Sequence, residues 1–388
     1  MSRPVALPTA AARPPVPLPP LRFTGAEILR DGRLQRRSLA VEEGRIGRGP
    51  LPEVDMSGFL LLPGIVDLRI DAVEPLAAPR PEAPETPAEA LARAGRAAAG
   101  GGVTTGWLTQ PWSWEGGAAS PDFAERLLAL HAATRAAAPG DLRIRLRAET
   151  HLTEGADRLL AAVRRHAVDL VVFSDRARRV AEDPDAPADL RRRAAAVLAG
   201  AASVPRHLCR LAEAFDTMGV TYGSQDDPDG ETRERFSMIG AGFADSPASR
   251  PAAAAAKAMH EPVVLPAAAL LGGAPRGSAA LLVAEGLCDA LATAGAAPCL
   301  AQAALALVDR GLRDLPGAWA LVSSGPAAIM GLTDRGSLER GRRADIVALD
   351  RETRRVEMTI ARGHLTHLGP AAAERLHRVA PALGIAAE

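Results

Sequence analysis

Short apolar runs alternate with longer amphipathic stretches through the middle of this 388-residue chain. Runs of this length, rich in Val, Ile and Leu, are typical of buried strands, and the stretches between them have the spacing of helices. The pattern predicts eight strands, over residues 60–68, 103–108, 142–149, 168–175, 219–224, 238–244, 262–265 and 288–291. It predicts helices between most of them, including 88–98, 121–137 and 155–166.

The two ends of the chain carry a different pattern. Residues 21–62 contain short β-like runs at 26–30 and 38–41, with glycines in the turns between them. A companion block, 335–368, contains similar runs at 344–349 and 356–360. Two β-rich flanks around a long middle predict one small β-sandwich that is built from both ends of the chain.

Eight β-then-α units in residues 63–334 favour an α/β fold of the (β/α)8 barrel type. A doubly wound sheet is the competitor, but it would show fewer units and a glycine-rich first turn after a strand. The glycines at 100–102 instead precede a strand. We therefore predict a barrel over 63–334 and a sandwich from 21–62 plus 335–368. Residues 1–20, with seven prolines, are expected to form a flexible tail, and 369–388 a C-terminal tail.

Charge and composition exclude several classes of partner. The chain has 46 basic and 46 acidic residues, so no broad basic face for nucleic acid is expected. No window approaches the roughly 20 apolar residues of a membrane span. Lys257 is the only lysine and lies in an alanine-rich stretch, which excludes a P-loop nucleotide enzyme.

The cysteine count and the first residues of the chain predict a cytoplasmic protein. Three cysteines form neither a disulfide framework nor a CxxC metal pair. The first 20 residues also lack the continuous apolar stretch of a signal peptide.

Polar residues recur where the predicted strands end. In a (β/α)8 barrel these positions form the active-site face, although a ring of structural ion pairs would have the same composition. Taken in chain order they are Arg69, Asp71, Gln110, Glu149, His151, Asp175, Arg176, Gln225, Asp226 and Asp227. Together they predict a polar site at one end of the barrel.

Two segments resemble the amidohydrolase superfamily. Residues 61–68, Leu-Leu-Pro-Gly-Ile-Val-Asp-Leu, are similar to the superfamily's first barrel strand. Residues 336–347, which contain Gly-Ser-Leu and Ala-Asp-Ile-Val, resemble its closing segment. The resemblance implies a barrel with a small sandwich and metal-dependent hydrolysis.

Within that superfamily the chain most resembles the diphosphatases of phosphonate breakdown, over residues 22–368. The motifs that carry this likeness are Pro-Arg-Pro at 79–81, Gly-Val-Thr-Thr at 102–105, Arg-Ala-Glu at 147–149, Ser-Asp at 174–175 and Ser-Gln-Asp-Asp at 224–227. Those enzymes cleave a ribose methylphosphonate triphosphate and release pyrophosphate. The likeness therefore implies phosphoanhydride hydrolysis in phosphonate metabolism, a divalent metal cofactor and an anionic sugar phosphate or phosphonate ester as the ligand.

The sequence departs from that family where histidines are expected. The departures are Arg69, two residues before Asp71; Arg176, after Asp175; Gln225, before Asp226; Arg276, in a loop without histidine; and Ala294, where an aspartate is expected. A guanidinium is permanently cationic and has no lone pair for a metal. These changes remove ligands that zinc and similar ions prefer.

Five carboxylates remain as candidate catalytic residues: Asp71, Glu149, Asp175, Asp226 and Asp227. They could hold a hard cation such as magnesium through oxygen alone, or pair with arginines in a network without metal. The network is favoured because several positions have changed together. In that case Arg69, Arg176, Gln225 and Arg276 are the candidate ligand-binding residues.

Three functions remain open at this point. The chain is an active hydrolase with an altered metal site, a catalytically silent homologue that binds an anionic sugar phosphate, or a subunit for another protein. A homo-oligomer is also open.

Overall fold

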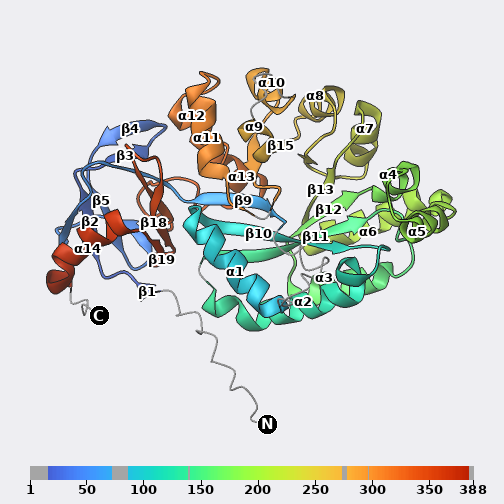
Figure 1. Cartoon of the computed structure of the whole chain (residues 1–388), viewed down its shortest axis with the longest axis horizontal. Coiled ribbons are helices and arrows are strands. Elements are labelled where there is room, and N and C mark those ends of the chain that lie inside the picture. The colour runs from blue at the N-terminus through green and yellow to red at the C-terminus, as the bar shows by residue number, and fades with distance from the viewer. Residues whose placement is uncertain (1–15, 72–85, 139, 273–277, 296, 384–388) are drawn as a thin grey trace, which may run out of the picture.

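The computed structural model describes residues 16–71, 86–138, 140–272, 278–295 and 297–383. Eight parallel strands follow one another around a barrel in chain order, from β9 to β16. Backbone hydrogen bonds beyond the ends of the first and last strands close it: the Ala294 N–H donates to the Arg69 carbonyl (2.9 Å) and the Asp71 N–H to the Gly295 carbonyl (3.0 Å). The (β/α)8 barrel with a separate small sandwich is confirmed (Figure 1).

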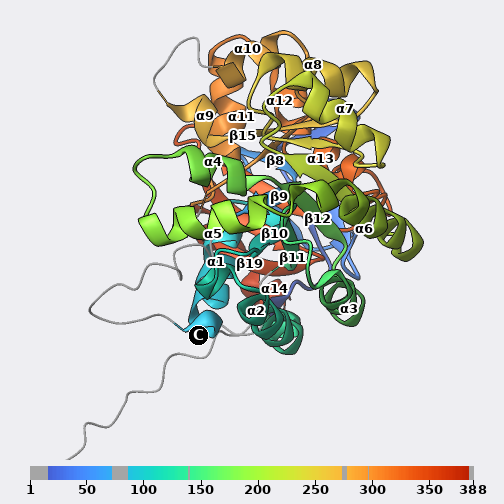
Figure 2. The same ribbon diagram turned by 90° about the vertical axis from the view of Figure 1, so that its right-hand side faces the viewer.

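Helices alternate with the barrel strands and surround them (Figure 2). The strands are β9 (Ile65–Ile70), β10 (Val103–Trp112), β11 (Asp141–Glu149), β12 (Leu170–Ser174), β13 (Thr221–Gln225), β14 (Ala244–Asp245), β15 (Val263–Pro266) and β16 (Ala290–Ala292). The helices are α1 (Pro87–Gly100), α2 (Pro121–Thr134), α3 (Ala156–His166), α4 (Arg176–Glu182), α5 (Ala188–Leu198), α6 (Val204–Met218), α7 (Gly230–Met238), α8 (Arg250–Ala258), α9 (Ala268–Leu271), α10 (Ser278–Ala284), α11 (Leu300–Asp309), α12 (Leu315–Ala320) and α13 (Ser324–Ile329). None of the helices in the described ranges is long and apolar enough to cross a membrane.

Local capping explains where several of these helices begin. Thr86 and Glu89 form a reciprocal capping box at α1, in which the Thr86 hydroxyl accepts from the Glu89 N–H (3.3 Å) and the Glu89 carboxylate accepts from the Thr86 N–H (2.8 Å). The Ser120 hydroxyl accepts from the Phe123 N–H (3.2 Å) at α2. The Asp175 side chain caps α4 in the same way. The side chain that directly follows β12 is thereby fixed at the start of the next helix.

The sandwich combines both chain ends, as predicted, in a seven-stranded and a four-stranded sheet. Its strands are β1 (Val16–Pro17), β2 (Leu21–Thr24), β3 (Glu27–Arg30), β4 (Arg33–Arg36), β5 (Leu39–Glu42), β6 (Arg45–Gly47), β7 (Glu53–Asp55), β8 (Phe59–Pro63), β17 (Ile346–Asp350), β18 (Val356–Ala361) and β19 (His364–Leu368). Most of the proline-rich tail lies outside the described residues, but β1 pairs with β19. Within the expected C-terminal tail, helix α14 (Pro370–Leu383) packs Ala372 and Leu376 into the sandwich core.

Two expected strands differ from the structure. The apolar run 60–68 is divided at Gly64, so that its first half is β8 of the sandwich and its second half is β9 of the barrel. A Cβ at residue 64 would lie 2.3 Å from the Thr104 hydroxyl, so the close approach of the two units there requires glycine. The strand expected at 238–244 is wrong over most of its length, because α7 extends to Met238 and β14 begins only at Ala244.

Candidate active site

The carboxyl ends of the barrel strands place most of the predicted polar residues at one face. Arg69 lies near the end of β9, Glu149 ends β11 and Gln225 ends β13. Asp175 directly follows β12. Because parallel strands in a barrel end at the same face, these side chains share one mouth.

Arg69 is paired with carboxylates at this mouth. Its Nε lies 3.0 Å from Asp71 Oδ2, and one terminal nitrogen lies 3.3 Å from the Ser246 hydroxyl and 3.9 Å from Asp245 Oδ1. Only 13% of the Arg69 side chain is exposed, so the guanidinium is held rather than solvated. The arginine therefore occupies the position of an expected imidazole ligand and neutralises the carboxylates around it.

A second guanidinium lies beneath the first, fully buried in the barrel. Arg145 of β11 donates to Asp245 Oδ2 (2.6 Å), to Gln225 Oε1 (2.7 Å) and to the Leu68 carbonyl (3.2 Å). Asp245 is also fully buried, and each of its two oxygens faces a different arginine. Burial opposes ionisation, but the charges of Arg145 and Arg69 hold the pKa of Asp245 below its usual range.

Sequence reasoning missed Arg145 and Asp245, although a signal for Arg145 was present. Arginines alternate along β11 at 143, 145 and 147, and period-two alternation places all three on one face of the strand. The intervening Ile144 and Leu146 join the cluster packed against the surrounding helices. The arginine face must therefore point into the barrel. Asp245 was missed because the strand it ends was expected at the wrong residues.

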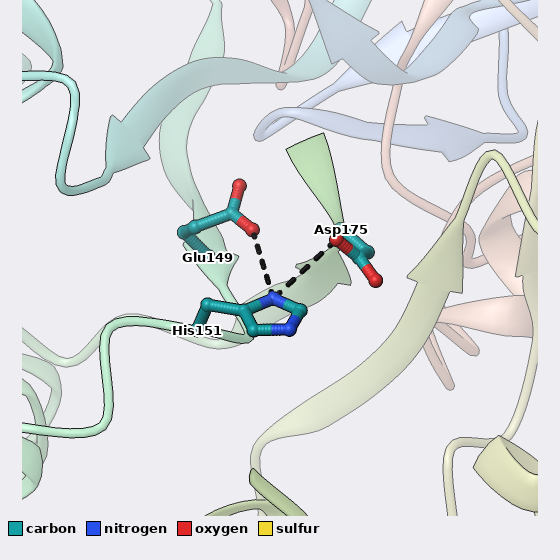
Figure 3. A group of neighbouring side chains, drawn as sticks. All are labelled: Glu149, His151 and Asp175. Atoms are coloured by element: carbon teal, nitrogen blue, oxygen red, sulfur yellow. Dashed lines mark ion pairs between the residues drawn. The ribbon is translucent and has the colours of Figure 1, made fainter. Parts of the chain in front are cut away.

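Glu149, His151 and Asp175 form a third cluster, shown in Figure 3. His151 Nδ1 lies 3.4 Å from Asp175 Oδ1 and 3.9 Å from Glu149 Oε1. Glu149 and His151 are buried, whereas 36% of the Asp175 side chain is exposed. His151, one of the polar residues predicted at the strand ends, thus lies between two predicted catalytic carboxylates.

The two carboxylates shift the protonation of this histidine. Hydrogen bonds with Asp175 and then Glu149 raise the pKa of His151 to about 9, which keeps the ring cationic at neutral pH. Burial opposes ionisation of Asp175, but contact with His151 lowers the pKa of that carboxyl. Burial raises the pKa of Glu149.

The other predicted residues have separate partners. Arg176 Nε lies 3.1 Å from Glu115 Oε1, a partner not expected from the sequence, and its backbone N–H donates to Glu149. Asp226 is paired with Arg179 (2.9 Å) and accepts from Gln225 (3.3 Å).

Asp227 has partners other than Arg69, Arg145 and His151. Asp227 is buried against the Ser224 hydroxyl (2.5 Å) and 3.7 Å from a terminal nitrogen of Arg233. Arg276, expected to bind the ligand, lies outside the described residues.

The donor set at the mouth does not suit the metal pair that the amidohydrolase resemblance implies. Guanidinium groups at 69 and 176, an amide at 225 and a methyl group at 294 stand where imidazole or carboxylate ligands were expected. Asp71 and Asp245, which could supply oxygen, already face Arg69. Only Glu149, His151 and Asp175 bring three metal-ligand atoms together within the described chain.

We predict strong energetic coupling between Arg145 and Asp245. Arg145→Met and Asp245→Asn should each destabilise the protein by about 3–5 kcal/mol, because each leaves a buried polar partner uncompensated. The double variant should lose clearly less than the sum, by about 2 kcal/mol or more. Urea unfolding of the four proteins measures this, and additive losses would contradict the pairing.

We also predict that His151 titrates near pH 9 in chelator-treated protein, followed by NMR of its ring protons. Because the folded-state pKa is raised, His151 contributes stability below about pH 6.5 that is lost as the pH rises through about 9. The difference in unfolding free energy between wild type and His151→Gln should shrink over that window. In Asp175→Asn the titration should move towards the ordinary histidine range; an unchanged midpoint would argue against the contact.

Comparison with known proteins gives a match of fold. No family model matches the sequence, and no curated protein does. Solved structures do match. A Xaa-Pro dipeptidase matches with a TM-score of 0.62 and 14% identity over 89% of this chain and 99% of its own. N-acetylglucosamine-6-phosphate deacetylase from Pasteurella multocida matches with 0.63 and 13% over 89% and 99%, and dihydropyrimidinase from Brevibacillus agri with 0.62 and 11% over 90% and 95%.

These neighbours are hydrolases of the amidohydrolase superfamily, and each match extends over nearly the whole neighbour. At 11–14% identity the likeness concerns the fold. The chain therefore has the amidohydrolase fold, a (β/α)8 barrel joined to a β-sandwich made from both chain ends.

Proposed function

We propose that this protein binds an anionic phosphate or phosphonate ester at the barrel mouth and does not hydrolyse it with a metal pair. The observation that carries the proposal is the position of Arg69, between Asp71 and Asp245 at the end of β9. A cation held there repels a metal ion, and it balances negative charge that would otherwise repel an anion.

The start of α4 supplies further cationic groups near the mouth. The side chains of Arg176, Arg178 and Arg179 are 34%, 66% and 56% exposed. Each contacts one carboxylate, through one nitrogen of a guanidinium that carries five N–H donors. Planar guanidinium groups match the oxygens of phosphate, so the remaining donors are suited to a phosphorylated ligand.

The ligand class rests on two resemblances. The motifs around Glu149, Asp175 and Asp226 resemble those of diphosphatases that act on a phosphonate sugar ester. One structural neighbour is named as a deacetylase of a phosphorylated sugar. Both support a sugar phosphate or phosphonate, and a role in phosphonate metabolism, as the function to test first.

A second candidate is a hydrolase that retains turnover, and the geometry of His151 favours testing it. An imidazolium beside two carboxylates can donate a proton to a leaving group, while a carboxylate orients water. Pyrophosphate release from a nucleoside or ribose triphosphate ester would support this candidate. If the protein only binds its ligand, we expect no pyrophosphate release above the uncatalysed rate.

Ligand binding should raise the thermal stability of the protein. At about 100 times the dissociation constant, ribose 5-phosphate or pyrophosphate should stabilise it by about 2.7 kcal/mol, or several degrees in Tm. Arg176→Gln with Arg179→Gln should reduce the shift, because two donors near the mouth are lost. Differential scanning fluorimetry of chelator-treated protein measures it.

Arg250→Gln is the matched control, since Arg250 pairs with Glu285 through an exposed contact on α8. It should keep the full shift. The proposal is contradicted if none of these anions stabilises the wild type. It is also contradicted if the control loses as much of the thermal shift as the Arg176→Gln, Arg179→Gln variant does. If no anion binds and another protein co-purifies with the chain, the function as a subunit of that protein is favoured.

A further inference from the structure

We propose that Glu149, His151 and Asp175 form a binding site for a single divalent transition-metal ion, of the Zn²⁺ or Mn²⁺ class. The site is separate from Asp71 and Asp245, which pair with Arg69 and Arg145, and it does not depend on the proposed anionic ligand. It uses two neighbouring strand ends, β11 and β12, and the turn after β11.

The ligand atoms are already gathered. One oxygen from each carboxylate and one ring nitrogen all lie within 4.8 Å of one another. Figure 3 shows the two carboxylates on the same side of the ring, both facing Nδ1. Glu149 and His151 are 3% and 5% exposed, and Asp175 leaves the cluster open towards solvent. An ion could therefore enter without rearrangement of the barrel.

The contacts around His151 Nδ1 suit a metal ion better than a proton. A single Nδ1–H can point at one acceptor, yet oxygens of Asp175, Glu149 and the Thr150 hydroxyl lie 3.4, 3.9 and 3.1 Å from this nitrogen. An ion between the groups would accept lone pairs from the nitrogen and from both carboxylates at once. Its two positive charges would also balance both carboxylates, whereas an imidazolium balances one.

The carboxylates are held in place by backbone groups. Both oxygens of Glu149 accept from the Arg176 N–H, at 3.1 Å each. Asp175 caps α4, with the Arg178 N–H at 3.5 Å. The Thr150 N–H donates to the Ser174 carbonyl (3.0 Å) and continues the pairing of β11 with β12. Such supporting contacts orient ligands and raise metal affinity.

The donor types indicate which ion fits. One imidazole nitrogen with two carboxylate oxygens suits zinc or manganese, whereas magnesium prefers oxygen ligands and retains several waters. Three protein ligands leave a coordination position open, as in catalytic zinc sites. Because Arg176 and Arg178 lie directly beside the cluster, an anion at the mouth could occupy that position.

Titration of the full-length, chelator-treated protein with ZnCl2 in a calorimeter tests the site. We expect one equivalent to bind, and MgCl2 to bind far more weakly. His151→Gln and Asp175→Asn should each weaken zinc binding at least ~10–100-fold. Circular dichroism and thermal melts establish that each variant is folded.

Asp309→Asn is the matched control. It removes the same charge from an exposed contact away from the mouth, where 57% of the Asp309 side chain is exposed and Arg354 is its partner. It should bind zinc as the wild type does. The proposal is overturned if the wild type binds no zinc or if both site variants bind zinc as tightly as the wild type. It is also overturned if the control loses as much zinc affinity as the site variants. The anion-dependent thermal shift is measured without metal, so its failure is a separate result.

Discussion

The fully buried guanidinium of Arg145 constrains the interior of this barrel. Arg145 has no exposed side-chain surface, and removal of its charge from water costs several kcal/mol unless partners replace the lost solvation. Asp245, Gln225 and the Leu68 carbonyl do so. One oxygen of Asp245 therefore forms an ion pair with Arg145, and its second oxygen faces Arg69.

The ion pairs of Asp245 determine what the mouth of the barrel can bind. Here Asp71 and Asp245 are occupied by guanidinium groups. Glu149 and Asp175 instead face an imidazole. The mouth is thus divided into an arginine part suited to anions and a compact part on β11 and β12 suited to one ion.

The fold could be predicted because apolar periodicity reports directly on strands and helices. The failures were local: the run 60–68 does not reveal that Gly64 separates two sheets, and 238–244 reads as apolar although α7 occupies its start. The residue types at the strand ends could also be predicted. Their pairing could not, because Glu115 and Arg179 come from a loop and a helix whose positions depend on packing. Arg145 could have been found from the alternation along β11.

The claim on which the account depends is that guanidinium groups occupy the place of a metal pair. Anomalous X-ray diffraction from crystals grown with zinc tests it most directly. The account predicts no zinc peak between Asp71 and Asp245, with Arg69 in contact with both, and one peak beside His151. Two zinc ions at the Asp71 side of the mouth, with Arg69 turned away from the carboxylates, would contradict it.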